Sequence, residues 1–192
     1  MSETDHVLVA RAKAGDRTAF EALVDRHARP IYGMIYRMVR GQREEAEDLT
    51  QEVLLRAFQA LPSFRGDSQF STWLHRIAVN RTLNRLQKKS IPARSIHDVA
   101  PDRPDLELEL PDQRHRPDRQ AERQELKGVL ERAIDHLSDS LRAVFVLREI
   151  EGLSHESIAS ILGVQSQAVR VRLHRAKKEL IKMLTPYLEG VR

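Results

Sequence analysis

Cationic side chains crowd the carboxyl-terminal part of the sequence, and their types are those that bind nucleic acid. They are Arg170, Arg172, Arg175, Lys177 and Lys178. Arginine can bond guanine through two parallel hydrogen bonds, glutamine can bond adenine, and lysine mostly neutralises phosphate. On a helix, one outward stripe would hold Gln167, Arg170, Val171, His174, Arg175 and Lys178, while Val169, Leu173, Ala176 and Leu180 would face inward. This stripe suits DNA recognition.

The residues before this helix predict how it is positioned. We expect Ser154 to cap a short helix that ends at Leu162, and a second helix to begin near Ser166 after a turn at 163–165. Gly163 can adopt the left-handed backbone conformation that a sharp turn requires. This spacing predicts a helix-turn-helix, whose second helix can enter the DNA major groove. A plain amphipathic surface helix with solvated charges is the alternative.

A second group of residues in the first half could hold an unstacked base. Aromatic, basic and small polar residues form a loop with Phe64, Arg65, Asp67 and Ser68, and the helix after it carries Arg76, Asn80 and Asn84. Such side chains bind single-stranded nucleic acid by stacking and by contacts to the backbone. Trp73 in the same helix is expected to belong to the core.

An acidic helix between these features points to a protein partner. Asp48, Gln51, Glu52 and Leu55 form a stripe, opposite the apolar residues Leu49, Val53, Ala57 and Phe58. Acidic residues at a helix start also favour the helix dipole, which is the purely structural explanation. An acidic stripe that includes a leucine suits a basic protein surface and would repel DNA.

The elements that must position these residues are all predicted to be helices. Apolar residues recur every three or four positions over 19–39, and Pro30 should kink that helix or break it in two. Asp67 or Ser68 is the expected N-cap of the helix that follows the loop. Farther along, one helix is expected between Ser138 and Gly152.

Proline marks a boundary between two helical parts. Five of the eight prolines lie between residues 91 and 117, and residues 91–125 hold six Lys and Arg against nine Asp and Glu. The alternating LELEL at 106–110 has no visible partner strand. We therefore predict two small all-α domains, 1–90 and 121–192, joined by a flexible, acidic, Pro-rich linker at 91–120.

The composition excludes several other classes of protein. The chain has no cysteine, its eight histidines are scattered, and no catalytic motif such as HExxH or a phosphate-binding glycine loop is present. We expect no enzyme activity, metal, cofactor or small-molecule substrate. No apolar run is long enough to span a bilayer and the N-terminus is too polar for a signal peptide, so a cytoplasmic protein without membrane insertion is expected.

Two blocks of the sequence resemble the two domains of bacterial sigma factors. They are EEAEDLTQEVLLRAFQALPSFRGDSQFSTWLHRIAVN and LSDSLRAVFVLREIEGLSHESIASILGVQSQAVRVRLHRAKKEL. The short chain with only a linker between them is similar to the extracytoplasmic-function (ECF) group of the sigma-70 family. The recognition helix departs from the frequent Gly-Thr-Val pattern, because Gln167, Ala168 and Val169 stand there. The base preference of better-known sigma factors at the minus-thirty-five element of promoter DNA therefore cannot be assigned to this chain.

The resemblance implies a set of partners and roles. The acidic stripe would bind the β′ subunit of RNA polymerase core, and the β subunit would be a further partner. The loop and helix after it would bind the minus-ten strand of promoter DNA, and the helix-turn-helix would bind the minus-thirty-five element. An anti-sigma factor and a role in a stress or envelope response are also implied. A free-standing DNA-binding regulator is the alternative, but it leaves the acidic helix and the loop without a role.

Overall fold

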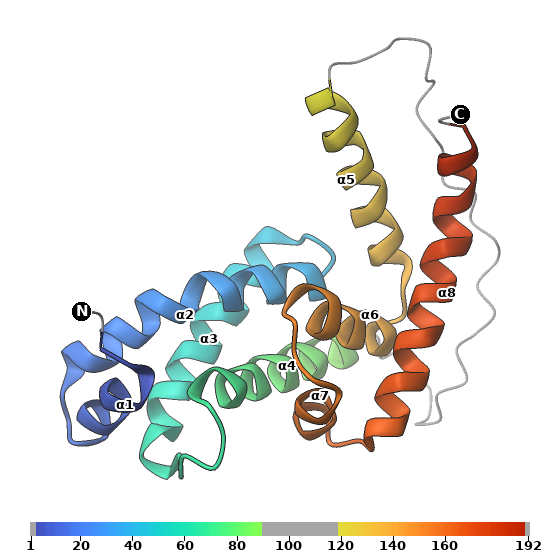
Figure 1. Ribbon diagram of the computed structural model, residues 1–192. Helices are drawn as coiled ribbons and strands as arrows, with labels where there is room; N and C mark the ends of the chain where they lie inside the picture. Colours follow the sequence, from blue (N-terminus) through green and yellow to red (C-terminus); the bar gives the residue numbers. More distant parts are fainter. Residues whose placement is uncertain (1–2, 90–118, 191–192) are drawn as a thin grey trace.

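The prediction of an all-helical chain is confirmed. The computed structural model describes residues 3–89 and 119–190, and every regular element within those two ranges is a helix (Figure 1). We call residues 3–89 the N-terminal half and residues 119–190 the C-terminal half. The linker was predicted at 91–120. Its residues 91–118, with the LELEL segment, lie outside the described residues, and residues 119–120 belong to the helix Arg119–His136.

Four helices make up the N-terminal half. They are α1 (Asp5–Lys13), α2 (Arg17–Met38), α3 (Arg43–Ala60) and α4 (Phe70–Lys89), with a short 3-10 turn, η1 (Leu61–Ser63), before the loop to α4. The sequence analysis did not anticipate α1. Asp16 begins α2, because its carboxylate accepts hydrogen bonds from the backbone N–H of Thr18 at 3.0 Å and of Ala19 at 3.3 Å.

Pro30 was predicted to kink this helix or to break it in two, and the break is wrong. Helix α2 runs through Pro30 without interruption, and Pro30 itself is exposed. The residues after it are held by the core, since Ile31, Met34 and Ile35 are each at most 1% exposed. This apolar packing outweighs the cost of the missing backbone donor. The helix ends at Met38, and Gly41 then takes a positive φ of 70°.

The predicted N-cap of the fourth helix is also wrong. Helix α4 begins at Phe70, and its first backbone bond runs from Trp73 N–H to the Gln69 carbonyl at 3.1 Å, so neither Asp67 nor Ser68 occupies the capping position. Aromatic packing at the helix start explains the shift, because the Phe70 ring lies 5.6 Å from Trp73 and 6.2 Å from Phe64.

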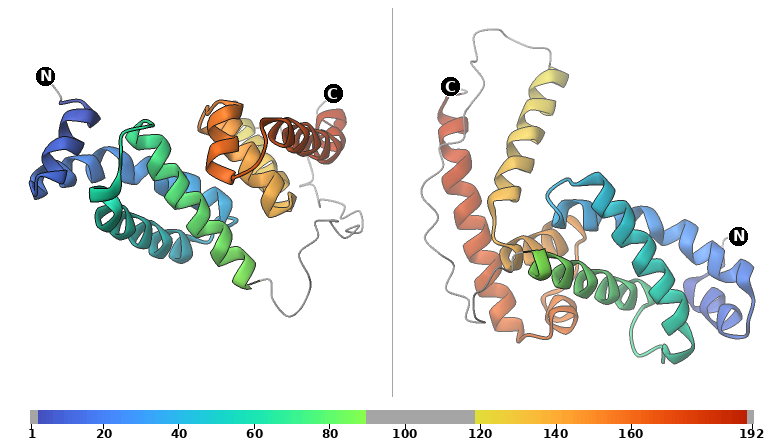
Figure 2. Two further views of the ribbon diagram at one scale, coloured as in Figure 1. Left: turned by 90° about the horizontal axis from the view of Figure 1, so that it is seen from below. Right: turned by 180° about the vertical axis from the view of Figure 1, so that it is seen from behind.

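Four helices and one widened turn make up the C-terminal half. They are α5 (Arg119–His136), α6 (Asp139–Phe145), the π-helical turn η2 (Val146–Ile150), α7 (His155–Leu162) and α8 (Ser166–Gly190). The helix predicted after Ser138 is present, with η2 as its last turn. Helices α5 and α8 lie side by side and extend away from the other helices (Figures 1 and 2).

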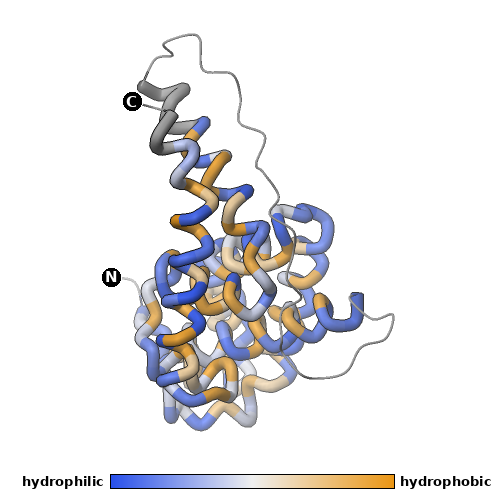
Figure 3. Tube along the Cα trace, turned by 90° about the vertical axis from the view of Figure 1, so that its right-hand side faces the viewer, coloured by the Kyte–Doolittle hydropathy of each residue, from blue (hydrophilic) through white to orange (hydrophobic). Residues whose placement is uncertain are grey.

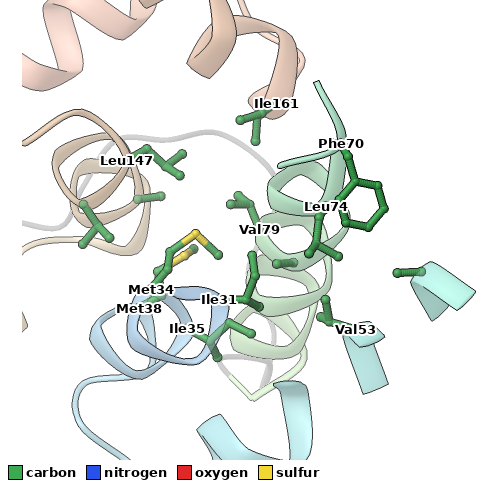
Figure 4. Close-up of a cluster of buried hydrophobic side chains, with 14 of the residues drawn as sticks. Ile31, Met34, Ile35, Met38, Val53, Phe70, Leu74, Val79, Leu147 and Ile161 are labelled. Carbon is green, nitrogen blue, oxygen red and sulfur yellow. The ribbon is translucent and has the colours of Figure 1, made fainter. Parts of the chain in front are cut away.

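One apolar cluster joins the two halves. Hydrophobic and hydrophilic residues alternate along the helices (Figure 3), and the hydrophobic faces meet between α2, α4, η2 and α7. Leu147 and Ile161 of the C-terminal half point into the same cluster as Met34 and Leu74 of the N-terminal half (Figure 4). All four side chains are at most 2% exposed. The described halves therefore share a core.

Candidate nucleic-acid interface

The helix-turn-helix forms as predicted. The Ser154 hydroxyl accepts a hydrogen bond from the Ser157 N–H at 3.1 Å and caps α7, which ends at Leu162. Gly163 follows with φ of 65° and ψ of 33°, the left-handed conformation in which a side chain would be strained. Helix α8 begins at Ser166. This turn sets the angle between α7 and α8.

The acidic residue at the start of α7 also contributes to the cap. The pKa of Glu156 is lowered, chiefly by a hydrogen bond to its own backbone N–H and then by one from Ser154. Arg170 on α8 adds a smaller attraction. Negative charge at this helix start is favoured by the helix dipole, so Glu156 stabilises α7 near the recognition helix.

Helix α8 divides into two faces as the sequence predicted. Its inward residues are Val169, Leu173, Ala176 and Leu180, each at most 9% exposed. Its outward residues, all exposed, are Gln167, Arg170, Val171, His174, Arg175 and Lys178. Within the described part of the chain, none of these six makes a hydrogen bond or ion pair. Lys177 differs, because its Nζ lies 2.9 Å from Glu149 Oε1.

The loop before α4 is anchored by its aromatic residue. Phe64 is only 9% exposed, and its ring lies 5.0 Å from the ring of Trp73. Lys13 of α1 donates a hydrogen bond from Nζ to the Phe64 carbonyl at 2.8 Å. Arg65 and Asp67 are exposed beyond this anchor, and Ser68 is half-buried. Phe64 therefore holds the base of the loop, whereas Arg65 and Asp67 face solvent.

A cavity of about 760 Å³ lies between this loop and α1. Its walls include His6 and Lys13 of α1 and Arg65, Ser68 and Phe70 of the loop and α4. The sequence analysis missed the contribution of α1, because the polar segment at 1–16 was considered only as a targeting signal. Aromatic and cationic walls around a cavity of this size suit a nucleobase with its phosphate.

The three candidate residues on α4 differ in exposure. Asn80 and Asn84 are exposed, one helical turn apart. Arg76, one turn earlier, is half-buried under α7, and its Nη2 lies 3.5 Å from the Ser160 hydroxyl. The three residues therefore share one side of α4, but α7 covers one end of it.

The acidic stripe on α3 is split by ion pairs. Asp48, Gln51 and Leu55 are exposed, and Leu55 is 59% exposed although it is apolar. Glu52 instead turns toward α4, where its oxygens lie 2.6 Å from Arg81 Nη2 and 3.1 Å from Arg85 Nη2. Three of the four candidates therefore lie on an open surface, whereas Glu52 forms ion pairs with arginines of α4.

One residue from the predicted apolar side of α3 is exposed. Phe58 was predicted on the apolar face of α3, yet it is 47% exposed. Its ring packs edge-on against Phe20 of α2, with ring centres 5.0 Å apart. Together with Leu55, Phe58 gives α3 an exposed apolar area beside Asp48, a combination that protein interfaces favour. Because adjacent residues are turned about 100° around a helix, Phe58 falls on the side of Leu55 and not with Ala57, so its assignment to the apolar side was wrong.

Among the residues that the structure describes, no three His, Asp or Glu side chains gather in a geometry that could hold a metal ion. In the same ranges, no helix combines the length and the apolar character needed to cross a bilayer.

Comparison with known proteins matches both halves to one family. Residues 23–91 match the family model Sigma-70 region 2, and residues 127–180 match the model Sigma-70, region 4. The RNA polymerase sigma-H factor of Pseudomonas aeruginosa is 38% identical over 193 residues, which cover 97% of this chain and 96% of that protein. The ECF RNA polymerase sigma-E factor of Escherichia coli K12 is 35% identical over 192 residues, covering 98% and 99% of the two chains.

Solved structures agree with this match. CnrH, solved in complex with the cytosolic domain of CnrY, superposes with a TM-score of 0.66 at 25% identity, covering 96% of this chain and 99% of CnrH. The sigma factor RpoE of Bartonella quintana has the same fold, with a TM-score of 0.62 at 22% identity over 86% of this chain and 96% of that one. Both sigma regions are present in order along nearly the whole chain, which belongs to the sigma-70 family of RNA polymerase sigma factors, in its ECF group.

Proposed function

We propose that this sigma factor binds promoter DNA through α8, the loop at 63–69 and α4, and binds RNA polymerase core through α3. The main support is the outward face of α8, the second helix of the helix-turn-helix, which presents three cations and a glutamine. Within the described residues those side chains have no hydrogen-bond or ion-pair partner in the protein. A free-standing regulator would leave the exposed stripe of α3 unexplained.

The minus-thirty-five element is assigned to α8. Gln167, Arg170, His174 and Arg175 are in position to reach base edges when the helix lies in the major groove. Val171 is 42% exposed and can contact a thymine methyl group. Lys178 is farther along the helix, where a phosphate contact is favoured.

The minus-ten strand is assigned to the loop and α4. Arg65, Asp67 and Ser68 face the strand, and Phe64 contributes by holding the loop against Trp73. Asn80 and Asn84 extend the surface along α4, and the half-buried Arg76 lies at one end of it. Single-stranded bases bind through stacking and through contacts to their exposed edges, which suits this mixture of side chains.

Core polymerase is assigned to α3. Asp48, Gln51 and Leu55 would make the contact, with Glu52 positioned beside them by Arg81 and Arg85. An exposed leucine next to carboxylates gives both apolar burial and attraction to a basic surface. We propose that the chain acts as an initiation factor and not as a catalyst, in the cytoplasm, where it meets polymerase.

An anti-sigma factor is a further proposed partner. The sigma factor RpoE of Bartonella quintana, which has the same fold, was solved in complex with the anti-sigma factor NepR. A comparable protein would release this sigma factor in a stress or envelope response.

The assignment of α3 can be tested by charge reversal at neighbouring positions. Asp48→Lys should abolish co-purification with core polymerase, because it reverses an exposed charge that no hydrogen bond or ion pair holds within the described residues. Glu47→Lys is the control: it reverses the charge at the next residue, which is turned about 100° around the helix and paired with Arg43 at 2.8 Å. Gel filtration with core measures both. If Asp48→Lys assembled with core as completely as Glu47→Lys and wild type do, α3 would not be part of the interface.

A further inference from the structure

Helix α1 is held firmly against α2. Leu8 on its apolar side is only 3% exposed. At its N-terminal end, Asp5 Oδ2 lies 2.7 Å from Nε2 of His27 in α2. At its other end, Arg11 Nη2 lies 2.7 Å from Asp16 Oδ2, which belongs to the carboxylate that caps α2. Helix α1 is therefore a fixed part of the fold, and a side chain on it can hold another segment in place.

The loop at 63–69 has an anchored base and a free tip. The Phe64 ring packs on Trp73, with ring centres 5.0 Å apart. Arg65 and Asp67, which follow, are exposed, and within the described residues neither makes a hydrogen bond or an ion pair. The direction of the tip therefore depends on how the peptide group after Phe64 is held.

Lys13 of α1 holds this peptide group. Its Nζ donates a hydrogen bond to the Phe64 carbonyl at 2.8 Å, and a charged donor makes such a bond stronger than one between neutral groups. A peptide group is planar, so fixing the carbonyl oxygen of Phe64 also fixes the N–H of Arg65. The bond therefore sets the direction in which the chain leaves the anchored residue toward the tip of the loop.

The helix dipole alone does not explain this contact. A cation in the last turn of a helix is favoured, and both Arg11 and Lys13 lie in the last turn of α1. The dipole does not, however, require an ammonium group to reach a segment 51 residues away. Within the described residues Lys13 makes no ion pair, so no carboxylate competes with the Phe64 carbonyl for its ammonium group.

Lys13 also lines the cavity of about 760 Å³ between α1 and the loop. Phe64, Arg65 and Ser68 line the same cavity from the side of the loop. Because the bond from Lys13 to Phe64 joins the two walls, it fixes the distance between them at this point. The same contact therefore shapes both the loop and the cavity beside it.

We propose that Lys13 is a positioning residue for the minus-ten strand: its bond to the Phe64 carbonyl holds the loop at 63–69 in the conformation that selects a base. The inference rests on the proposed function, because it takes the loop as part of the minus-ten surface. Helix α1 lies outside residues 23–91, which match Sigma-70 region 2, so the family match itself assigns no role to Lys13.

The advantage of this bond is an ordered loop before DNA arrives. A loop that is already ordered loses less conformational entropy when it binds. Without the bond, only a fraction of the molecules present the selective conformation, and the affinity for the preferred base falls by that fraction.

Three variants separate positioning from a direct contact with DNA. Lys13→Met removes the ammonium group and keeps an unbranched side chain, whereas Lys13→Arg keeps a cationic donor that can reach the carbonyl. Arg17→Met is the control, because it removes a charge from an exposed residue that has no hydrogen bond or ion pair within the described ranges. Urea unfolding should find all three variants folded under the conditions of the assays, since both substituted positions are exposed.

The first measurement is the order of the loop in the full chain. Trypsin cuts after arginine, and it cuts a loop faster when that loop can leave its anchored conformation. Mass spectrometry should find cleavage after Arg65 roughly threefold to tenfold faster in Lys13→Met than in wild type and Arg17→Met. The rate in Lys13→Arg should be close to that of wild type.

The second measurement is the selectivity of holoenzyme for a base. The probes are single-stranded oligonucleotides that carry the minus-ten motif found by run-off transcription, together with their single-base variants. At one position of the motif, Lys13→Met should lower the preference for the favoured base roughly threefold to tenfold, with the salt dependence unchanged. Lys13→Arg should restore the preference. A direct phosphate contact by Lys13 would instead weaken binding to all oligonucleotides alike and lower the salt dependence by roughly one released ion.

Each contrary result overturns the proposal. Equal cleavage after Arg65 in Lys13→Met and Arg17→Met would show that Lys13 does not hold the loop. A base preference unchanged in Lys13→Met, one not restored in Lys13→Arg, or a uniform loss of binding would show that the bond does not position the loop for the strand. In all these cases the proposed function survives, because wild-type holoenzyme still selects its bases. Wild-type holoenzyme without any base preference would overturn the proposed function, and this inference with it.

Discussion

Arg170 and Lys178 lie on the same exposed face of α8, but we expect them to contribute differently. Arg170→Ala should relax preference at one base position of the minus-thirty-five element, by about 1–3 kcal/mol of discrimination. Lys178→Ala should weaken every promoter alike and lower the salt dependence of binding by roughly one released ion. Holoenzyme binding to single-base promoter variants at several salt concentrations measures both effects.

A matched control lies on the same helix. Lys177→Ala also removes a cation, but one that is paired with Glu149, so it should change the salt dependence less than Lys178→Ala does. If Arg170→Ala weakened binding to all variants equally, Arg170 would be a backbone contact and not a reader of bases.

At the same scale, the limits of sequence-based prediction are visible in individual side chains. The spacing of polar and apolar residues correctly indicated an outward stripe on α8, because residues three or four positions apart lie on the same face of a helix. Spacing could not show that Glu52 pairs with Arg81, that Phe64 is buried under Trp73, or that Arg76 lies beneath α7. Each of these depends on a contact between helices distant in sequence.

At the scale of single elements, the start of α2 depends on a charge. Thr18 and Arg11 hydrogen-bond the Asp16 carboxylate and lower its pKa from 3.8 to about 2. Because the folded pKa lies below the unfolded value, the ionised group stabilises the fold above about pH 4, and this stabilisation is lost as the pH falls toward 2. Asp16→Asn keeps a capping side chain but not the charge.

The variant should therefore be less stable than wild type near neutral pH, and the difference should shrink below about pH 4. Urea unfolding followed by circular dichroism between pH 3 and 7 measures it. Glu21→Gln removes a charge from an exposed position of the same helix without removing a capping bond. A difference between Asp16→Asn and wild type that stayed constant across this range would show that the charge of Asp16 does not stabilise α2.

Most helices followed from local signals, and the errors have local causes. The turn of the helix-turn-helix was predicted residue by residue. Serine commonly caps a helix, as Ser154 does, and glycine readily adopts the left-handed conformation, as Gly163 does. Pro30 was expected to kink or break the helix, but packing of the residues around it keeps α2 continuous. The start of α4 was misplaced, because aromatic packing of Phe70 and not a polar cap sets it.

At the scale of the whole molecule, two sequence regions that read as separate domains pack into one core. The sequence contains no signal for this contact: Arg142 looks like an ordinary surface arginine, yet it is completely buried against α2. The boundaries proposed for the two domains remain a prediction.

Run-off transcription with RNA polymerase core and a library of promoter sequences tests the central claim most directly. The account predicts transcripts only when both the chain and core are present. Their templates should share two motifs, at the minus-ten and minus-thirty-five positions, and Asp48→Lys should abolish the signal. The contrary result would be no promoter-specific transcript with core, while the purified chain alone bound duplex DNA tightly at a defined sequence.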